Sequence, residues 1–373
     1  MKDTTAVFSD NLRAVRRERR MTQKALAERL GYSEKAISKW ESGHALPPSA
    51  VLPELARALG IGIDDLFTEG GNVRYYLGID GGGTKTDFVL TDAEGQVRAR
   101  TVLEASNPND VGEEIMRDVL ARGIRTVMRG YPYAQTSAFA GIAGGITGRN
   151  RDLILSFLEE YRFAAASCGS DAENAVAAGL GDGDGIAVIL GTGSIAFAKR
   201  GGTVTRYGGF GYLFGDVGSG FSIGRDGILA ALHEEEGSGP PTAITGAAVA
   251  HLGGQSVLSE LATFYRDGKR AVAALAPLVF EAYRSGDAVA ERILQKNAEG
   301  IASLISAAAG SHGESPPLTV VLCGGLTTYQ DILIPLICRA LGEDARRYCL
   351  AVCERPMVYG ALRRAGLTAE PRA

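Results

Sequence analysis

Two glycine-rich turns, each directly after a short apolar segment, are the features of this sequence best suited to chemistry. Residues 80–84 read DGGGT and follow YYLGI, whereas residues 191–194 read GTGS and follow GIAVIL. An apolar strand pattern also follows each turn. Backbone N–H groups in such turns can converge on an anion, and glycine lets the chain approach a phosphate closely. Two such turns facing each other across a cleft would hold a nucleoside triphosphate.

Neither turn fits the two most familiar phosphate-binding motifs. The segment GIDGGGTKT lacks the Gly-Lys-Ser/Thr triplet of a P-loop. The segment GTGSIA formally satisfies the dinucleotide-binding pattern GxGxxA, but that pattern must open a helix. The residues that follow, SIAFAKRGGTVTRYGG, instead predict a second strand and a further hairpin. Both turns are therefore interpreted as phosphate hairpins between strands.

Carboxylates and hydroxyls stand beside these turns, as phosphoryl transfer requires. Asp80 ends the first strand and is expected to hold Mg²⁺ through water; its alternative role is that of a turn aspartate. Asp171 opens the helical pattern SDAENAVAAG, where an ordinary helix cap is one interpretation. Thr84 and Thr192 offer hydroxyls to phosphates, and Lys85 adds a positive charge.

Composition predicts a cytoplasmic protein of two or three domains. The 373 residues are 45% hydrophobic and 22% charged, with a net charge of −4, so the whole chain is no polycation. The first residues contain no apolar signal-peptide core, and no apolar run is long enough for a bilayer, which predicts no membrane partner. Five cysteines without a CxxC motif suit a reducing compartment.

Residues 8–67 form a separate helical module. Five short helical patterns fit this range; Thr22 and Ser33 stand at N-cap positions, and Gly31 and Gly60 end two helices. A stripe of apolar residues at helical spacing predicts its core: Leu26, Leu30, Ile37, Leu52, Leu55 and Leu59. Residues 68–74, which contain TEGGNV and lack periodicity, are expected to be a linker.

The segment TQKALAERLGYSEKAISKWESG resembles the helix-turn-helix of Cro/C1-type (XRE) repressors. The resemblance implies a recognition helix in the major groove of operator DNA, with Ile37 and Trp40 in the core. It also implies a set of DNA-contacting residues: Gln23, Ser33, Glu34, Lys35, Ser38 and Lys39. Because the module is nearly neutral, its DNA affinity should be modest and a homodimer is expected. The alternative is a helical module that binds proteins.

Residues 74–373 resemble the sugar kinase, heat-shock ATPase and actin superfamily, and within it the BadF/BadG/BcrA/BcrD group that contains N-acetylglucosamine kinase. The motifs are DGGGTKT, LGTGS, TVVLCGGLTTY, GGFGYLFGDVGSGFSIGRDGI and PMVYGALRRAG. The resemblance implies an α/β actin-like fold of two ribonuclease-H-like lobes around a cleft. The expected lobes are residues 75–182 and 183–373, with the last helix returning to the first lobe. The implied cofactors are ATP and Mg²⁺.

The same resemblance assigns roles to individual residues. Asp171 corresponds to the general base that takes the proton of the accepting hydroxyl. The ATP phosphates and nucleoside are assigned to Gly81, Gly82, Gly83, Thr84, Lys85, Gly191, Thr192, Gly193, Ser194, Gly324 and Gly325. The sugar is assigned to Asn107 in SNPND, to Asp171, and to Gly209, Phe210 and Asp216.

Two related families are excluded because their cysteine motifs are absent. Two differences from the family's sequence pattern also bear on which substrate is expected. No CxCGxxGCxE zinc cluster of the ROK type occurs, and no cysteine motif for an interface iron–sulfur cluster occurs. Val217 stands where the family usually has Glu in GDEGS, and Ala143 replaces a serine that helps to hold the sugar. We expect an N-acetylglucosamine kinase that also acts as a sugar-responsive DNA-binding regulator. The alternatives are a non-catalytic regulator that senses sugar and ATP, and a kinase for glucosamine, N-acetylmuramic acid or another sugar.

Overall fold

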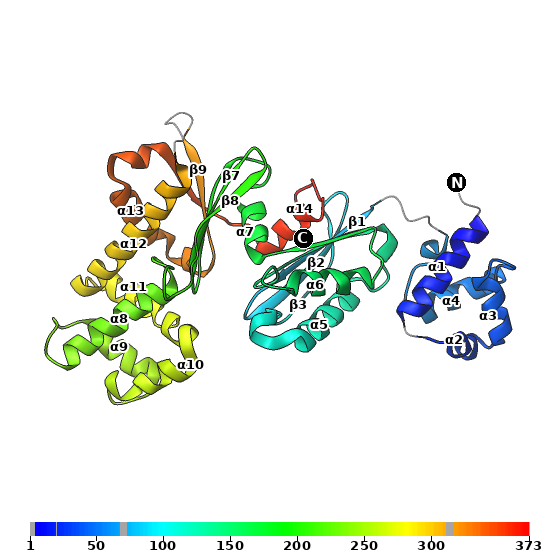
Figure 1. Cartoon of the computed structure of the whole chain (residues 1–373), viewed down its shortest axis with the longest axis horizontal. Coiled ribbons are helices and arrows are strands. Elements are labelled where there is room, and N and C mark those ends of the chain that lie inside the picture. The colour runs from blue at the N-terminus through cyan, green and yellow to red at the C-terminus, as the bar shows by residue number, and fades with distance from the viewer. Residues whose placement is uncertain (1–3, 20, 68–72, 311–316, 373) are drawn as a thin grey trace. The chain divides into compact units, whose positions relative to one another are not determined.

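The structure, a computed structural model, describes residues 4–19, 21–67, 73–310 and 317–372. Figure 1 shows a helical domain at the N-terminus and two α/β lobes. The chain divides into two compact units: one contains the helical domain, the first lobe up to Ala178 and the C-terminal segment from Pro356, and the other, the second lobe, contains Gly179–Arg355. Most of the expected linker, residues 68–72, lies outside the described residues.

The helical domain is built as its capping residues predict. Its helices are α1 (Thr4–Glu18), α2 (Gln23–Leu30), α3 (Glu34–Glu41) and α4 (Leu52–Leu59). Thr22 accepts the N–H of Ala25 to start α2, and Gly31 ends that helix at φ 68°. The predicted stripe lies in one buried cluster with Phe8, Leu12 and Trp40, except that Leu52 is only partly buried. This domain therefore has its own core.

The first lobe is a five-stranded sheet in the order β3-β2-β1-β4-β5. The first three strands form an antiparallel meander, and β4 and β5 run parallel to β1. The strands are β1 (Tyr75–Gly81), β2 (Lys85–Asp92), β3 (Val97–Glu104), β4 (Thr136–Ile142) and β5 (Ala165–Gly169). The helices are α5 (Pro108–Val127), α6 (Asn150–Glu159), α7 (Asp171–Leu180) and α14 (Met357–Arg364).

The C-terminal helix α14 packs directly on the first strand of this sheet. A Cβ atom built on Gly78 of β1 would lie 2.8 Å from the carbonyl oxygen of Val358, and one on Gly360 would collide with the carbonyl of Asn174. Glycine at these two positions lets α14 lie against both β1 and α7. The last helix of the chain thus closes the first lobe.

The second lobe repeats the topology of the first, in the order β10-β9-β6-β7-β8. Its strands are β6 (Gly185–Leu190), β7 (Ser194–Arg200), β8 (Thr203–Gly208), β9 (Leu318–Cys323) and β10 (Tyr348–Val352). Its helices are α8 (Gly220–Glu235), α9 (Ala243–Leu252), α10 (Leu261–Ala273), α11 (Ala276–Arg284), α12 (Ala288–Ala309) and α13 (Gln330–Leu341). The long helix α12 carries a buried face of eleven residues and packs on α8, α13 and the sheet.

Two features of this fold confirm expectations from the sequence. The segment after GTGS is strand β7, paired antiparallel with β6, so the GxGxxA match opens no helix. Two sheets of identical strand order match the expected actin-like α/β architecture. In the part of the chain that the structure describes, no helix combines the length and apolarity needed to cross a membrane.

Candidate active site

The first phosphate turn lies where three segments of the first lobe meet. Gly82 N–H donates to the carbonyl of Lys85 at 2.9 Å, which closes the hairpin between β1 and β2. The N–H of Ala143, just after β4, donates to the carbonyl of Gly81 at 2.7 Å, and the N–H of Ser106 donates to the carbonyl of Gly82 at 3.2 Å. The turn is therefore held in place by loops that follow β3 and β4.

Asp80 stands at the carboxyl end of β1 and is partly buried. Its Oδ1 accepts a hydrogen bond from Asn174 Nδ2 at 2.7 Å. Burial raises the pKa of Asp80 to about 6; the hydrogen bond from Asn174 opposes this rise, and the nearby charge of Asp171 adds to it. The sequence interpretation singled out Asp80 but missed Asn174, because an asparagine inside a helix pattern carries no local sign of its burial.

Asp171 is the first residue of α7, directly after β5. Its Oδ1 accepts the N–H of Ala172 at 3.0 Å, while Ser170 N–H donates to Glu173 Oε1 at 3.2 Å. The Asp171 side chain reaches solvent, yet desolvation by the surrounding protein raises its pKa. These two properties suit a concave position that is open to water but bounded mostly by protein. Such a carboxylate can accept a proton nearer to neutral pH than an ordinary aspartate.

The predicted sugar segment lies beside the same edge of the first sheet. Asn107 caps α5, because its Oδ1 accepts the N–H of Asn109 at 3.1 Å, and its Nδ2 donates to Asp110. A Cβ atom on Gly144 would lie 2.5 Å from Asn107 Oδ1. Asn107 is thus adjacent to the loop that contains Ala143, the position where the family's serine is missing.

In the second lobe, the turn at residues 191–194 is joined by hydrogen bonds to the start of α8. The N–H of Gly220 donates to the carbonyl of Gly191 at 2.8 Å, and the N–H of Phe221 donates to the carbonyl of Thr192 at 3.1 Å. Ser194 Oγ donates to the carbonyl of Val217 at 2.8 Å. The phosphate turn and the signature segment therefore form one bonded unit.

Asp216 lies against this turn. A Cβ atom built on Gly193 would lie 2.8 Å from Asp216 Oδ2, so a larger residue at 193 would meet this carboxylate. The sequence assigned Asp216 to the sugar, and this assignment stays a prediction; the structure shows that its carboxylate lies beside the second phosphate turn. Gly209 packs on Ile195 of β7, whereas Phe210 is 69% exposed with the Arg206 guanidinium 5.7 Å from its ring centre.

The predicted nucleoside turn lies beside the second phosphate turn. Gly324 follows β9 at φ 98°, and a Cβ atom on it would lie 2.5 Å from the carbonyl oxygen of Leu190, the last residue of β6. Because β6 and β9 are parallel, both turns emerge at the same edge of the sheet. Gly325 begins the next short helix, with open space where a side chain would point.

The helical domain presents a polar face on α3. The side chains of Glu34, Lys35, Ser38 and Lys39 are exposed, whereas Ile37 and Trp40 are buried, which confirms their predicted place in the core. Ser33 caps the helix by accepting the N–H of Ala36 at 3.2 Å.

Gln23 was predicted to touch DNA phosphate. Its Nε2 donates to Glu41 Oε2 at 2.8 Å, and Glu41 is also paired with the buried Arg16. The side-chain nitrogen of Gln23 is therefore bound within the domain, and its contact with phosphate stays a prediction.

Comparison with known proteins places the chain in a family. The profile of the BadF/BadG/BcrA/BcrD ATPase family matches residues 77–344. The chain belongs to this ATPase family. A helix-turn-helix profile matches residues 12–66, which covers most of the helical domain.

Two curated relatives of this BadF-type ATPase are kinases. The N-acetyl-D-glucosamine kinase of Dictyostelium discoideum is 31% identical over 290 residues, which covers 72% of this chain and 90% of that protein. The N-acetylmuramic acid/N-acetylglucosamine kinase of Clostridium acetobutylicum is 32% identical over 238 residues, covering 61% of this chain and 76% of that protein. A crystal structure of a putative N-acetylglucosamine kinase from Chromobacterium violaceum has 26% identity and a TM-score of 0.64, covering 79% of this chain and 99% of that one.

The surroundings of Asp80 fit a divalent cation such as magnesium. Asp80 offers a hard carboxylate oxygen whose negative charge is disfavoured by burial and by Asp171, and a divalent cation would offset both effects. Among the described residues, no group of three or more His, Cys, Asp and Glu side chains gathers as a metal site. Mg²⁺ usually keeps several waters and is bound through one or two carboxylates plus phosphate oxygens.

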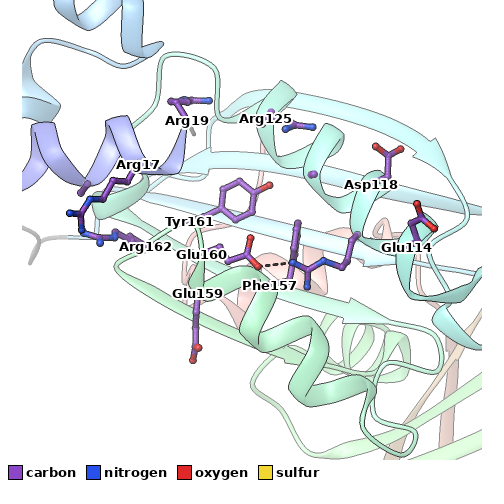
Figure 2. A pocket seen from close by; sticks show the side chains of 13 residues that line it. Arg17, Arg19, Glu114, Asp118, Arg125, Phe157, Glu159, Glu160, Tyr161 and Arg162 are labelled. Atoms are coloured by element: carbon purple, nitrogen blue, oxygen red, sulfur yellow. Dashed lines mark hydrogen bonds and ion pairs between the residues drawn. The ribbon is translucent and has the colours of Figure 1, made fainter. Parts of the chain in front are cut away.

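A hollow away from these residues is lined by side chains of α5 and α6 and by Ala14, Arg17 and Arg19 (Figure 2). Its lining includes Arg117, which donates to Glu160 Oε1 at 2.6 Å and stands 4.9 Å from the ring centre of Phe157. Glu114, Asp118 and Arg125 of α5 line it too, so charges of both signs are interspersed. None of the residues predicted to bind ATP or sugar lines this hollow, and we assign no ligand to it.

Proposed function

We propose that this ATP-dependent sugar kinase transfers the γ-phosphate of ATP to the 6-hydroxyl of N-acetylglucosamine. The observation that carries the proposal is the arrangement of two carboxylates in the first lobe. Asp80 at the end of β1 is hydrogen-bonded to Asn174, which lies one turn along the helix that Asp171 opens. The carboxylate that we assign to magnesium, on β1, is thereby hydrogen-bonded to the helix that carries the carboxylate that we assign to the proton.

In this mechanism each group has a separate task. Asp171 takes the proton of the accepting hydroxyl as the oxygen–phosphorus bond forms and the bond to the β-phosphate oxygen breaks, releasing ADP. Magnesium, when bound, supplies charge stabilisation for the phosphates beside Asp80. The backbone N–H groups of the two glycine turns orient the phosphates. Asn107, beside the loop at Gly144, is positioned to contact the sugar.

The identity of the sugar rests on similarity. The relatives from Dictyostelium discoideum and Clostridium acetobutylicum are both named for N-acetylglucosamine, and the second also for N-acetylmuramic acid. Ala143 and Val217 remain the departures that bear on the substrate, because Ala143 lies on the loop next to Asn107 and Val217 follows Asp216.

A second function, binding of operator DNA as a homodimer, is favoured by α3. Lys35, Ser38 and Lys39 are exposed on a helix whose other face is buried in the core. Exposed lysines and hydroxyls on the second helix of a helix-turn-helix are suited to phosphates and base edges.

One assay tests the kinase proposal. ADP release is measured with a panel containing N-acetylglucosamine, N-acetylmuramic acid, glucosamine and glucose, and we expect the highest kcat/KM with N-acetylglucosamine. A higher value for another sugar would reassign the substrate. Binding of sugar and ATP without ADP release would instead favour a non-catalytic regulator.

A further inference from the structure

The peptide bond between Val217 and Gly218 is held on both sides. Its carbonyl accepts a hydrogen bond from Ser194 Oγ of the phosphate turn at 2.8 Å. Its N–H donates to Asn297 Oδ1 at 3.1 Å, and Asn297 lies on α12, 79 residues further along the chain. Because carbonyl and N–H belong to one planar unit, rotating this peptide would break both hydrogen bonds.

This peptide lies next to a strained residue. Asp216 has φ 60°, in the left-handed region that residues other than glycine seldom adopt, and Gly218 has φ 81°. Such strain persists only where the surrounding structure fixes the backbone, and it is concentrated at functional sites. Here the strained residue is the one whose carboxylate lies against Gly193 of the phosphate turn.

The amide of Asn297 has only one possible orientation. Its Nδ2 donates to the carbonyl of Ile293 at 2.9 Å and to Asp226 Oδ2 at 3.3 Å. Both partners are acceptors here: a carbonyl oxygen can only accept, and the Asp226 carboxylate also pairs with Lys296 at 3.0 Å and with Arg225 at 2.9 Å. Nδ2 must therefore face Asp226, which turns Oδ1 toward Gly218.

We propose that Asn297 is a positioning residue of the ATP site. It is 1% exposed and reaches the phosphate turn only through the peptide at Gly218. It fixes that peptide, which supports both Ser194 and the strained conformation of Asp216. The inference rests on the kinase function but does not depend on which sugar is phosphorylated.

Three variants separate this role from general packing. Asn297→Leu keeps a similar volume and removes both hydrogen-bonding functions. Asn297→Asp keeps the acceptor for Gly218 but places a second carboxylate against Asp226. In the double variant Asn297→Asp with Asp226→Asn, the amide and the carboxylate exchange places. An amide N–H at position 226 then faces a carboxylate oxygen at position 297. Ile305→Ala is the control for lost stability, because Ile305 is fully buried on the same helix.

The decisive measurement is the dissociation constant of MgATP by calorimetry in the absence of sugar, together with the melting temperature. We expect Asn297→Leu and Asn297→Asp to weaken MgATP binding by roughly 5–100-fold, the range for a lost buried hydrogen bond. The double variant should reverse at least half of the change that Asn297→Asp causes in the logarithm of the MgATP dissociation constant. Ile305→Ala should lower the melting temperature with less than about a two-fold effect on MgATP binding.

Two results would overturn the inference. The first is parent-like MgATP affinity in folded Asn297→Leu, and the second is a double variant that binds no better than Asn297→Asp. ADP release by the parent with the sugar panel is measured in parallel. A parent that binds MgATP but releases no ADP would contradict the kinase function and leave the affinity comparison valid.

Discussion

Asn174 Nδ2 donates a hydrogen bond to Asp80 Oδ1 at 2.7 Å, and so ties the helix that Asp171 opens to the end of the strand that precedes the first phosphate turn. The same nitrogen also donates to the carbonyl of Gly141 at 3.1 Å. Any side chain at Gly141 would collide with the Asn174 amide. Strand β1, strand β4 and helix α7 therefore meet at one buried amide, and both carboxylates depend on it.

Replacing Asn174 should change the pH dependence of catalysis. Its hydrogen bond favours the ionised form of Asp80, so Asn174→Ala should raise the pKa of Asp80 further. The acid limb of the pH profile of kcat/KM should then move to higher pH. Stability should fall by about 1–3 kcal/mol, because Asp80 and the carbonyls of Gly141 and Ile79 lose a buried donor. An unshifted pH profile in a folded variant would show that Asn174 supports only the fold.

Asp171→Asn should abolish most turnover. A positioned base contributes about 10²–10⁴-fold to the rate, and the amide cannot take the proton. Binding of ATP and sugar should remain nearly unchanged, as measured by calorimetry. Asp118→Asn, which removes an exposed carboxylate paired with Arg122 on α5, is the matched control and should retain activity. Parent-like turnover of Asp171→Asn would mean that Asp171 has only a structural role at the start of α7.

Asp80→Asn should stabilise the metal-free protein at alkaline pH. Burial raises the pKa of Asp80 to about 6, above its ordinary value of 3.8, so the folded state binds the proton more tightly than the unfolded state. The stability conferred by the protonated form is therefore lost as pH rises through about 6. A shift of about two units corresponds to on the order of 2–3 kcal/mol.

We expect urea unfolding in EDTA to show the advantage of Asp80→Asn at pH 8 and a smaller one at pH 5. The same variant should lose activity, because it lacks the carboxylate that we assign to magnesium. An advantage that is larger at pH 5 than at pH 8 would contradict the proposed titration of Asp80.

Lys35→Ala combined with Lys39→Ala should weaken DNA binding. If both exposed lysines contact phosphates, the slope of log affinity against log salt should fall by about two. Binding is measured on DNA fragments selected from genomic DNA with the intact protein. Arg57→Ala, on the exposed side of α4, is the control, and kinase activity should survive in both variants. Failure of the parent to retain any fragment would favour a protein-binding module.

Sugar binding and DNA binding should influence each other. The helical domain ends at Leu66 and the kinase part begins at Tyr75, so few residues join them. Two recognition helices of a dimer must lie about 34 Å apart to read successive major-groove faces, and lobe closure could change that spacing.

We therefore predict that amino sugar changes operator affinity by about 5–150-fold, with a reciprocal change in sugar affinity. Asp171→Asn prevents turnover during the titration of labelled operator. Superimposable curves with and without saturating sugar would show that the two activities share a chain without coupling.

The sequence by itself determined the features that depend on neighbouring residues. The turns at 80–84 and 191–194 need glycine beside a strand, and the caps at Thr22 and Ser33 bond to N–H groups three residues away. Local chemistry of this kind leaves a readable pattern. The resemblance of the quoted motifs to known families predicted two actin-like lobes after a helix-turn-helix.

Only the tertiary structure decided which polar side chains support these turns. Asn174 and Asn297 each lie inside a helix pattern and bond to residues 94 and 79 positions away, Asp80 and Gly218 respectively. A buried asparagine has no local signature that distinguishes it from an exposed one, because its burial is set by elements distant in the sequence. The place of Asp216 against Gly193 likewise depends on hydrogen bonds from α8 to the phosphate turn, which no spacing along the chain encodes.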